Sequence, residues 1–389
     1  MQDNLSEEAL LSAVKELIAI KSTADNPAGL RAAYDYMRDI VLSCNKDITI
    51  EEFESNGKPS FLAYRGEQRP KKFQIILNAH VDVVPGKSEQ YQAFIKDGKL
   101  YGRGAYDMKA AAVVLAQVFC EFVDKASYGL ALQVVTDEEN SGAHGTLHQI
   151  KQGIRGDFVI CGECGRSTDS HEIANEAKGI AVASLGFRGS STHGAYPWKG
   201  DNAALKALRF TQLLYEKYPA PTEATTESTF TITSVDATSD AYTKTPDLAV
   251  VNVDARYAPS DPNFRSKAHF AALIGEIDPN AEILKLYDFS SPIYTSPHNP
   301  SLLSLLASAE KIEGAEFSLV RRNGTSDGRH YGDVGCESCE FGIAGEHQHG
   351  DDEYITLEAF RNYLDTMRDF LGKTIAVEQY SQANRAFSA

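Results

Sequence analysis

Apolar positions in the first half of the chain predict helices alternating with buried strands. After Ser6, which can cap a helix, apolar residues recur at helical spacing as far as Ile20. Two more helices and five short strands are predicted after it, the helices at 29–43 and 109–125 and the strands at 48–53, 61–64, 73–78, 130–136 and 158–161. This alternation indicates an α/β fold with a mostly parallel sheet covered by helices.

The pattern changes after Gly179, where strands alternate apolar and polar residues. The elements follow the order strand, helix, strand, strand, helix, strand, at 180–187, 202–218, 229–234, 248–257, 262–277 and 281–287. This order suits a small ferredoxin-like α+β domain with a half-exposed sheet. Helices then resume, at 299–312 and 356–371. We therefore predict one domain built from residues 1–178 and 291–389, interrupted by a second domain at residues 179–290.

Charged and imidazole side chains directly follow three of the buried strands. His80 follows the strand at 73–78. Glu138 and Glu139 end the next strand along the chain, and Glu163 ends the third. Charge at the end of an apolar strand is costly without a partner, and open α/β sheets bind ligands at this edge. The sequence therefore predicts a polar site at the carboxyl ends of these strands.

Five residues at these strand ends and in glycine-rich loops are candidate metal ligands: His80, Asp107, Glu139, Glu163 and His349. Imidazole and carboxylate ligands without thiolate suit a hydrolytic zinc site, with cobalt as a substitute. Five ligands are too many for one tetrahedral catalytic metal, but they suit two ions that share a carboxylate. Such a pair can polarise a scissile carbonyl and activate water.

Two neighbours of these ligands can support such chemistry. Glu138 precedes Glu139, and because successive side chains point in different directions, one can bind metal while Glu138 takes a proton from water. Asp82 can accept a hydrogen bond from the imidazole of His80. Taken singly, adjacent glutamates are usually a solvated surface, and a lone His-x-Asp is usually a coincidence.

Composition limits the kinds of binding partner and the cellular compartment that we expect for this protein. The net charge of −16 argues against nucleic acid and anionic membranes, which need a basic patch. The N-terminus lacks a basic and apolar leader, and no apolar run approaches the ~20 residues that span a bilayer. We expect a cytoplasmic protein with its six cysteines reduced. The pairs Cys161/Cys164 and Cys336/Cys339 could form a zinc site, but packing thiols are favoured because the pairs lie far apart.

Seven motifs then occur in order along nearly the whole chain: Asn78-Ala-His80-Val-Asp82-Val-Val-Pro, Gly102-Arg-Gly-Ala-Tyr-Asp107-Met-Lys, Thr136-Asp-Glu138-Glu139, Gly162-Glu163, His193-Gly-Ala-Tyr-Pro, Gly324-Thr-Ser-Asp-Gly-Arg329 and His349-Gly-Asp-Asp-Glu353. With them the chain resembles the acetylornithine deacetylase, succinyl-diaminopimelate desuccinylase and carboxypeptidase G family of two-zinc amidohydrolases and peptidases. The resemblance implies a zinc-peptidase-like catalytic domain, at 1–178 and 291–389, and a lid and dimerisation domain at 179–290.

The resemblance also implies a role for each candidate ligand. Asp107 would bridge two zinc ions. His80 and Glu163 would complete one site, and Glu139 and His349 the other. Glu138 would be the general base. His347 is a rival to His349, but the family's histidine stands four residues before a glutamate, as His349 does before Glu353.

In the inserted domain, the resemblance gives His193 a catalytic role. In dimeric members this lid histidine reaches the partner subunit's active site and stabilises the oxyanion, so a homodimer is expected. A plain polar turn residue is the alternative. Around Thr243 the chain departs from the family, because it lacks an asparagine that many members carry there.

Recognition of a substrate carboxylate requires a cationic side chain or backbone donors. The positions that match the family are Arg329, Arg256, Lys178, Gly324 and Thr325. Each cation could equally form a structural ion pair.

Together these features predict a hydrolase that cleaves the amide bond of a small N-acyl amino acid, of the acetylornithine or succinyl-diaminopimelate type. A glutamate at position 163 looks like the deacylase side of the family. A dipeptidase or glutamate carboxypeptidase is the alternative, with the same chemistry and another pocket. A non-catalytic binding protein would be expected to lack Glu138 or a ligand, and this chain lacks none. The resemblance further predicts a cis peptide bond between Asp107 and Met108.

Overall fold

The computed structural model describes residues 5–44, 46–126 and 129–386, and of residues 374–386 it describes the backbone alone. The chain divides into two compact units. Unit 1 contains Met1–Glu176, Ile293–Val320 and Ser326–Ala389. Unit 2 contains Ala177–Pro292 and the short return segment Arg321–Thr325. Unit 2 is therefore an insertion into the chain of unit 1.

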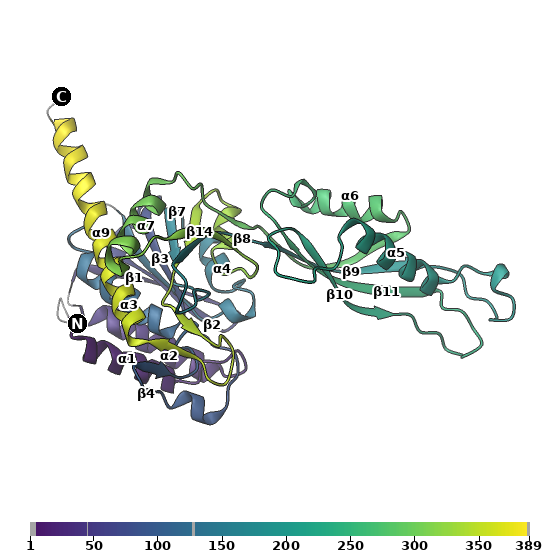
Figure 1. The fold of residues 1–389 in the computed structure, drawn as a ribbon, viewed down its shortest axis with the longest axis horizontal. Coiled ribbons are helices and arrows are strands. Elements are labelled where there is room, and N and C mark those ends of the chain that lie inside the picture. Colours follow the sequence, from purple (N-terminus) through teal and green to yellow (C-terminus); the bar gives the residue numbers. More distant parts are fainter. Residues whose placement is uncertain (1–4, 45, 127–128, 387–389) are drawn as a thin grey trace. The chain divides into compact units, whose positions relative to one another are not determined.

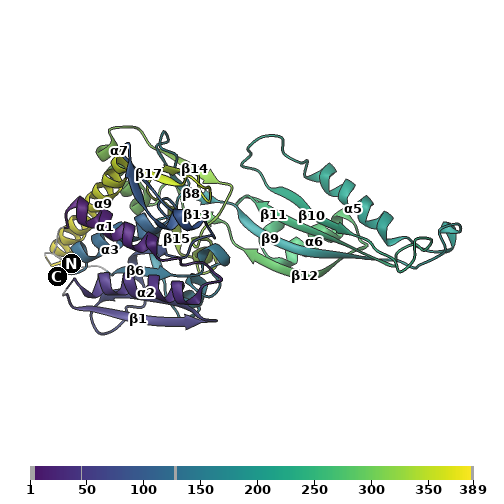
Figure 2. The same cartoon turned by 90° about the horizontal axis from the view of Figure 1, so that it is seen from below.

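A nine-stranded sheet lies at the centre of unit 1 (Figures 1 and 2). Its strands are paired in the order β1-β2-β6-β3-β7-β15-β8-β13, with β14 paired to β8. They span Ile48–Ser55 (β1), Lys58–Arg65 (β2), Phe73–His80 (β3), Leu130–Val135 (β6), Gly156–Cys161 (β7), Glu172–Ala177 (β8), Ile293–Tyr294 (β13), Ser318–Arg322 (β14) and Glu337–Glu340 (β15).

The four central strands of this sheet, β6, β3, β7 and β15, run parallel. Their flanking partners, β2 on one side and β8 on the other, are antiparallel to them, as β1 is to β2. Strands β3 and β6 are apolar along most of their length because helices cover both faces of the sheet. The expected α/β fold is confirmed, and its parallel part is the centre of a mixed sheet.

Two layers of helices cover this sheet. One face packs on α1 (Glu7–Ala19), α2 (Pro27–Leu42), α3 (Lys109–Phe122), α7 (Pro300–Glu313) and α9 (Leu357–Ala386). The other face packs on the shorter α4 (Thr146–Lys151) and α8 (Arg329–Gly332). Helix α3 contacts the sheet on one side and α1 and α9 on the other, which explains why its sequence is apolar all round.

A second, small sheet of unit 1 joins distant parts of the chain. It consists of β4 (Phe94–Lys96), β5 (Lys99–Tyr101), β16 (Gly345–Glu346) and β17 (Tyr354–Thr356), in the order β16-β17-β5-β4. Tyr354 lies opposite Tyr101 in the antiparallel β17–β5 pair. The residue before β17 therefore lies beside the loop that follows β5.

Unit 2 has the expected order of elements. Its sheet is β10-β11-β9-β12, formed by β9 (Gly179–Arg188), β10 (Thr229–Asp236), β11 (Leu248–Tyr257) and β12 (Ala281–Ser290). Helices α5 (Ala203–Lys217) and α6 (Lys267–Ile277) share one apolar core with it. The helix expected at 262–277 is a short 3₁₀ turn followed by α6, because Ser266 caps a new helix by accepting from the N–H of His269.

The expectation of six reduced thiols is wrong for one pair of cysteines. Cys44, at the end of α2, is disulfide-bonded to Cys120 of α3, with Cα atoms 5.9 Å apart. The packing of α2 on α3 creates this proximity, which the sequence separation of 76 residues conceals. The other four cysteines are buried thiols. None of the groups that could hold a metal among the described residues contains more than one of them.

No helix in the described part of the chain is long and apolar enough to cross a membrane.

Candidate metal centre

The predicted polar site forms at the carboxyl ends of the central parallel strands. His80 is the last residue of β3, and Glu138 and Glu139 begin a 3₁₀ turn just after β6. Glu163 follows β7 after one intervening glycine. Because β6, β3 and β7 are neighbours in the sheet, these side chains meet at one edge.

Asp107 lies between the two histidines of the site. Its Oδ1 is 3.0 Å from Nε2 of His80, and its Oδ2 is 3.1 Å from Nε2 of His349. Gln348 also donates a hydrogen bond from Nε2 to Oδ2 of Asp107, over 2.8 Å. A carboxylate with one oxygen toward each imidazole has the geometry of a group shared by two ions.

The carboxylates of Glu139 and Glu163 each lie near a different one of the two histidines. Oε2 of Glu139 is 3.2 Å from Nε2 of His349, and Asp107, Glu139 and His349 form one group that could hold a metal. Oε2 of Glu163 is 3.5 Å from Nε2 of His80. Glu163 and His80 form a second such group.

Glu138 also belongs to the group of His80 and Glu163. Its neighbour Glu139 belongs instead to the group of Asp107 and His349. A further group joins Asp107 and Glu163 to the buried thiol of Cys164, a residue expected to be a packing thiol. Geometry thus brings all five expected ligands together with two additional donors.

Several carboxylates share this small buried volume. Burial and the nearby Asp107 carboxylate raise the pKa of Glu163 to about 8. Burial and Glu163 likewise raise the pKa of Glu138. Burial opposes ionisation of Asp107 too, but hydrogen bonds from His349 and His80 outweigh it and hold its pKa well below the usual range. Hydrogen bonds to Asp107 and Glu139 raise the pKa of His349 to about 10.

This donor set fits divalent cations. Oε1 of Glu139 is buried and has no hydrogen-bond partner among the described residues, which is costly for a carboxylate oxygen unless a cation binds it. Crowded carboxylates with raised pKa values would be neutralised by the same ions. Two imidazoles and several carboxylates are ligands that zinc accepts.

Asp82 organises this edge of the sheet more widely than expected. Its backbone oxygen lies 3.1 Å from Nδ1 of His80, and its carboxylate lies 3.6 Å from the same atom. The carboxylate also accepts the N–H groups of Glu138 and Glu139, over 3.2 and 3.0 Å. One buried aspartate therefore orients the imidazole and the turn that carries both glutamates.

Close packing at Gly104 and hydrogen bonds from Glu353 restrain the loop that carries Asp107. Gly104 has a φ of 86°, which favours glycine, and a Cβ there would lie 2.9 Å from both Lys109 and Val83 side-chain atoms. The Asp107–Met108 peptide bond is cis, as predicted. Glu353, which stands four residues after His349, accepts hydrogen bonds from three N–H groups of this loop.

His347, the rival to His349, lies outside the cluster. Its ring contacts Tyr354, with ring centroids 5.9 Å apart, and it belongs to none of the candidate metal groups. Both histidines have left-handed backbones, with φ of 62° at His347 and 61° at His349.

Among the expected substrate contacts, Arg329 lies in unit 1 beside the cluster. Its guanidinium is buried, donates to the backbone oxygens of Ser141 and Ser326, and has NH1 3.6 Å from Oε1 of Glu138. Its Nε has no partner among the described residues. Arg329 is therefore anchored on two sides and faces Glu138.

The other expected contacts belong to unit 2. Nζ of Lys178 donates to the backbone oxygen of Thr225, and Arg256 pairs with Asp254 on its own strand. Gly324 and Thr325 lie in the return segment. His193 is exposed, and its Nδ1 accepts the N–H of Ala195 over 3.1 Å.

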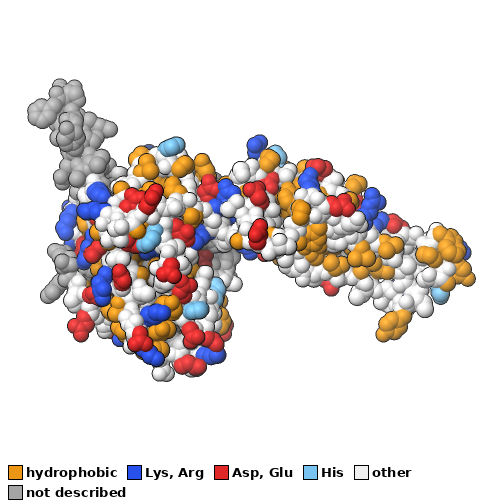
Figure 3. Space-filling model, viewed as in Figure 1, with side chains coloured by type: hydrophobic (Ala, Val, Ile, Leu, Met, Phe, Trp, Pro, Cys, Tyr) orange, Lys and Arg blue, Asp and Glu red, His pale blue; other side chains and the backbone are white. Residues whose placement is uncertain are grey.

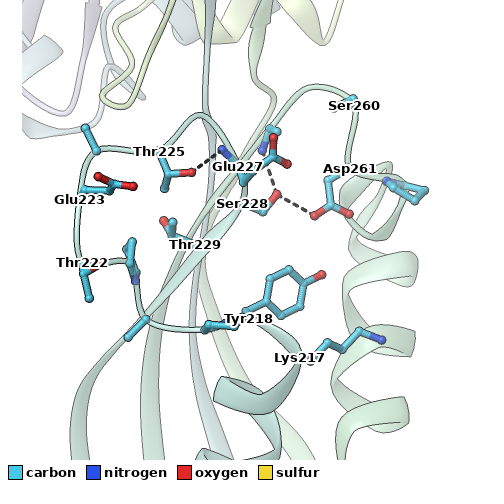
Figure 4. A pocket seen from close by; sticks show the side chains of 16 residues that line it. Lys217, Tyr218, Thr222, Glu223, Thr225, Glu227, Ser228, Thr229, Ser260 and Asp261 are labelled. Atoms are coloured by element: carbon cyan, nitrogen blue, oxygen red, sulfur yellow. Dashed lines mark hydrogen bonds between the residues drawn. The ribbon is translucent and has the colours of Figure 1, made fainter.

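Unit 2 also contains an open pocket of about 650 Å³, between the end of α5 and the start of β10 (Figure 4). Its polar side chains bond largely to one another, as Ser228 does to Asp261 and the N–H of Glu227 does to Thr225. None of the candidate metal groups lies there. The pocket thus offers no hydrolytic centre comparable to that of unit 1.

The fold and the cluster together define a metal-dependent hydrolase, an α/β protein with a histidine and carboxylate centre at the carboxyl edge of its sheet. The chain belongs to peptidase family M20/M25/M40, whose sequence pattern matches residues 76–373. It is accordingly an enzyme of the metallopeptidase and amidohydrolase class.

Comparison with individual proteins agrees with this family. A succinyl-diaminopimelate desuccinylase of Rickettsia bellii (strain OSU 85-389) is 25% identical over 390 residues, which cover 94% of this chain and 96% of that protein. An M20 family metallo-carboxypeptidase of Sulfolobus solfataricus is similar in structure, with a TM-score of 0.73 and 16% identity over 93% of this chain and 98% of that one. A dinuclear metal-binding M20 peptidase of Bacillus subtilis gives 0.67 and 12%, over 95% and 98%.

Proposed function

We propose that this enzyme hydrolyses the amide bond of a small N-acyl amino acid, of the succinyl-diaminopimelate or acetylornithine type, with two zinc ions. The observation that carries the proposal is the placement of Asp107 between two imidazole and carboxylate groups. The desuccinylase relative, aligned along nearly the whole chain, supports the acyl-amino-acid substrate.

In this proposal Asp107 would be shared by the two ions. His80 and Glu163 would hold one ion, and Glu139 and His349 would hold the other, with Co²⁺ as a substitute for zinc. The dinuclear peptidase of the same fold supports two metals. When bound, the ions would polarise the scissile carbonyl and lower the pKa of water between them.

The protein's own residues then move the proton and orient the substrate. Glu138, beside the first group of ligands, takes the proton from the attacking water and passes it to the leaving amine. The carboxylate of Asp82 keeps Glu138 in place by accepting a hydrogen bond from the backbone N–H of Glu138. Arg329, facing Glu138, is the candidate in unit 1 for binding the substrate carboxylate.

The remaining proposed contacts come from unit 2. Lys178, Arg256, Gly324 and Thr325 would bind the substrate carboxylate as alternatives or additions to Arg329. His193 would stabilise the oxyanion in the partner subunit of a homodimer.

Exposed apolar side chains on unit 2 support the dimer. Figure 3 shows apolar side chains gathered over this unit. On α5, Leu205 and Leu208 are 64% and 56% exposed. Apolar surface gathered in one place is typical of an interaction site.

An amine-release assay tests the substrate. Succinyl-diaminopimelate and acetylornithine are compared with Xaa-Glu dipeptides, each with the zinc-loaded enzyme and with its Glu138→Ala variant as the blank. We expect the highest kcat/KM on an acylated amino acid. Preference for a dipeptide would instead support the second candidate, a dipeptidase or glutamate carboxypeptidase; an M20 metallo-carboxypeptidase of similar fold makes this candidate worth testing.

A further inference from the structure

Glu353 binds the backbone of the Asp107 loop through hydrogen bonds. The β17–β5 pairing places it beside Gly102, whose N–H donates to the backbone oxygen of Glu353 over 3.1 Å. Its Oε1 accepts three N–H groups, those of Gly104, Tyr106 and Asp107, over 2.9, 2.9 and 3.0 Å. One carboxylate oxygen thus fixes the backbone on both sides of the turn that aims Asp107.

The other oxygen of Glu353 binds Arg103. NH1 of Arg103 is 2.5 Å from Oε2 of Glu353, and both side chains are buried, with exposures of 3% and 0%. NH2 of the same guanidinium donates to the backbone oxygens of His349 and Gly350, over 3.0 and 3.1 Å. Arg103 therefore links Glu353 to the loop that carries His349.

These bonds connect two segments that are far apart in the sequence. Asp107 precedes the inserted unit and His349 follows it. The His349 side chain is 45% exposed on a left-handed backbone, so packing alone restrains it little. The guanidinium fork suits this link because its fixed N–H groups reach a carboxylate and two carbonyls at once, which a lysine ammonium on a flexible stem does not reproduce.

We propose that Arg103 and Glu353 form a clamp of positioning residues, which holds the Asp107 and His349 loops at the separation that the second metal ion requires. This role rests on the proposed metal ligands. Loss of the clamp is expected to weaken binding of the ion assigned to Glu139 and His349 more than binding of the ion assigned to His80 and Glu163. The Asp107 loop would serve both ions, whereas the His349 loop would serve only the first of them.

A buried ion pair could instead serve stability alone. The chain offers a matched control in Arg166 and Glu313, whose side chains are 4% and 7% exposed and lie 2.7 Å apart in the same unit. Neither belongs to a candidate metal group. The Glu313 carboxylate contacts the side chains of Arg166 and His171. Glu313→Gln therefore removes a comparable buried charge pair without removing a side-chain contact to the Asp107 or His349 loop.

Titration calorimetry of the metal-free full-length protein with Zn²⁺ tests the clamp. The His349→Ala variant first marks which of the two binding events depends on His349. We expect Glu353→Gln to weaken that event by about 10–100-fold and the other far less, as is usual for groups that orient metal ligands. The visible spectrum of the Co²⁺-loaded protein should change in the same variant. Glu313→Gln should lower Tm but leave both affinities and the spectrum unaltered.

Arg103→Lys provides a second variant if Glu353→Gln folds poorly. It keeps the positive charge beside Glu353 but loses the fork to the His349 loop, and we expect the same selective loss. Wild-type affinities in both variants, with two ions bound, would overturn the clamp alone. Equal weakening of both events would overturn its selectivity. A wild-type protein that binds no pair of ions would overturn the proposed function and the clamp together.

Discussion

Asp107 shows at the scale of single residues what the sequence could and could not predict. The family resemblance predicts that Asp107 bridges two metal ions, and the structure places one of its oxygens near each of the two histidines of the site. The contacts that aim it come from Gln348 and Glu353, which lie far along the chain. No local pattern marks such contacts, since they depend on how distant loops pack.

Replacement of Asp107 by alanine should abolish tight binding at both metal sites, because the bridging carboxylate serves both ions. Metal content after dialysis, measured by mass spectrometry, checks this. His349→Ala is the comparison, since it should lose one ion only. Two tightly held zinc equivalents in Asp107→Ala would show that Asp107 is not the bridge.

Glu138→Ala should retain near-normal metal content and lose about 10²–10⁴ in kcat, the usual contribution of a general base. Glu138 belongs to the same candidate metal group as His80 and Glu163, so the experiment must distinguish a general base from a metal ligand at this position. Metal content and kcat measured together for Glu138→Ala and Glu139→Ala distinguish the two. If metal is lost from the first variant and kept in the second, the assigned roles are exchanged.

At the scale of elements, long periodic segments were predictable and short polar strands were not. The strand β11 was predicted with its observed bounds, because it alternates over ten residues. The strand β15 was missed, although it lies between β7 and β8 near the middle of the sheet. Its sequence Glu-Ser-Cys-Glu carries no β pattern, and only its neighbours make it a strand. Helix α9 continues past residue 371, where its apolar periodicity ends.

The turn after β5 allows a test at this scale. Gly104→Ala should destabilise the fold by about 1–3 kcal/mol and reduce metal affinity, because a left-handed backbone and contacts at 2.9 Å oppose a Cβ there. Gly98→Ala is the control: its φ is also positive, at 72°, but nothing lies within 4 Å of its added Cβ. Chemical denaturation and zinc titration of both variants check the prediction. Equal effects would mean that backbone strain alone, without the metal loop, explains the loss.

At the scale of the whole molecule, the proposed dimer predicts complementation between two inactive variants. Losing His193 should cost about 10²–10³ in turnover with little effect on metal affinity. When Glu138→Ala and His193→Ala subunits are mixed, each mixed dimer has one site with both residues intact if His193 acts across the interface. We then expect partial recovery of activity.

Heterodimer formation in this experiment is verified by native mass spectrometry. Heterodimers that form without any recovered activity would show that His193 acts within its own subunit or has no catalytic role. A protein that stays monomeric at assay concentrations would exclude the shared site altogether.

The position of β15 in the sheet has a consequence for synthesis on the ribosome. Strand β7 pairs with β15 along Phe158–Cys161, yet β15 is translated only after β8 to β14. At about 5–20 residues per second, that edge lacks its partner for on the order of 10–30 s in every new chain. An open edge beside an apolar strand is where nascent chains pair wrongly with one another. The inserted unit therefore lengthens the time for which each new chain depends on protection, by chaperones or by the ribosome itself, before β15 can pair with β7.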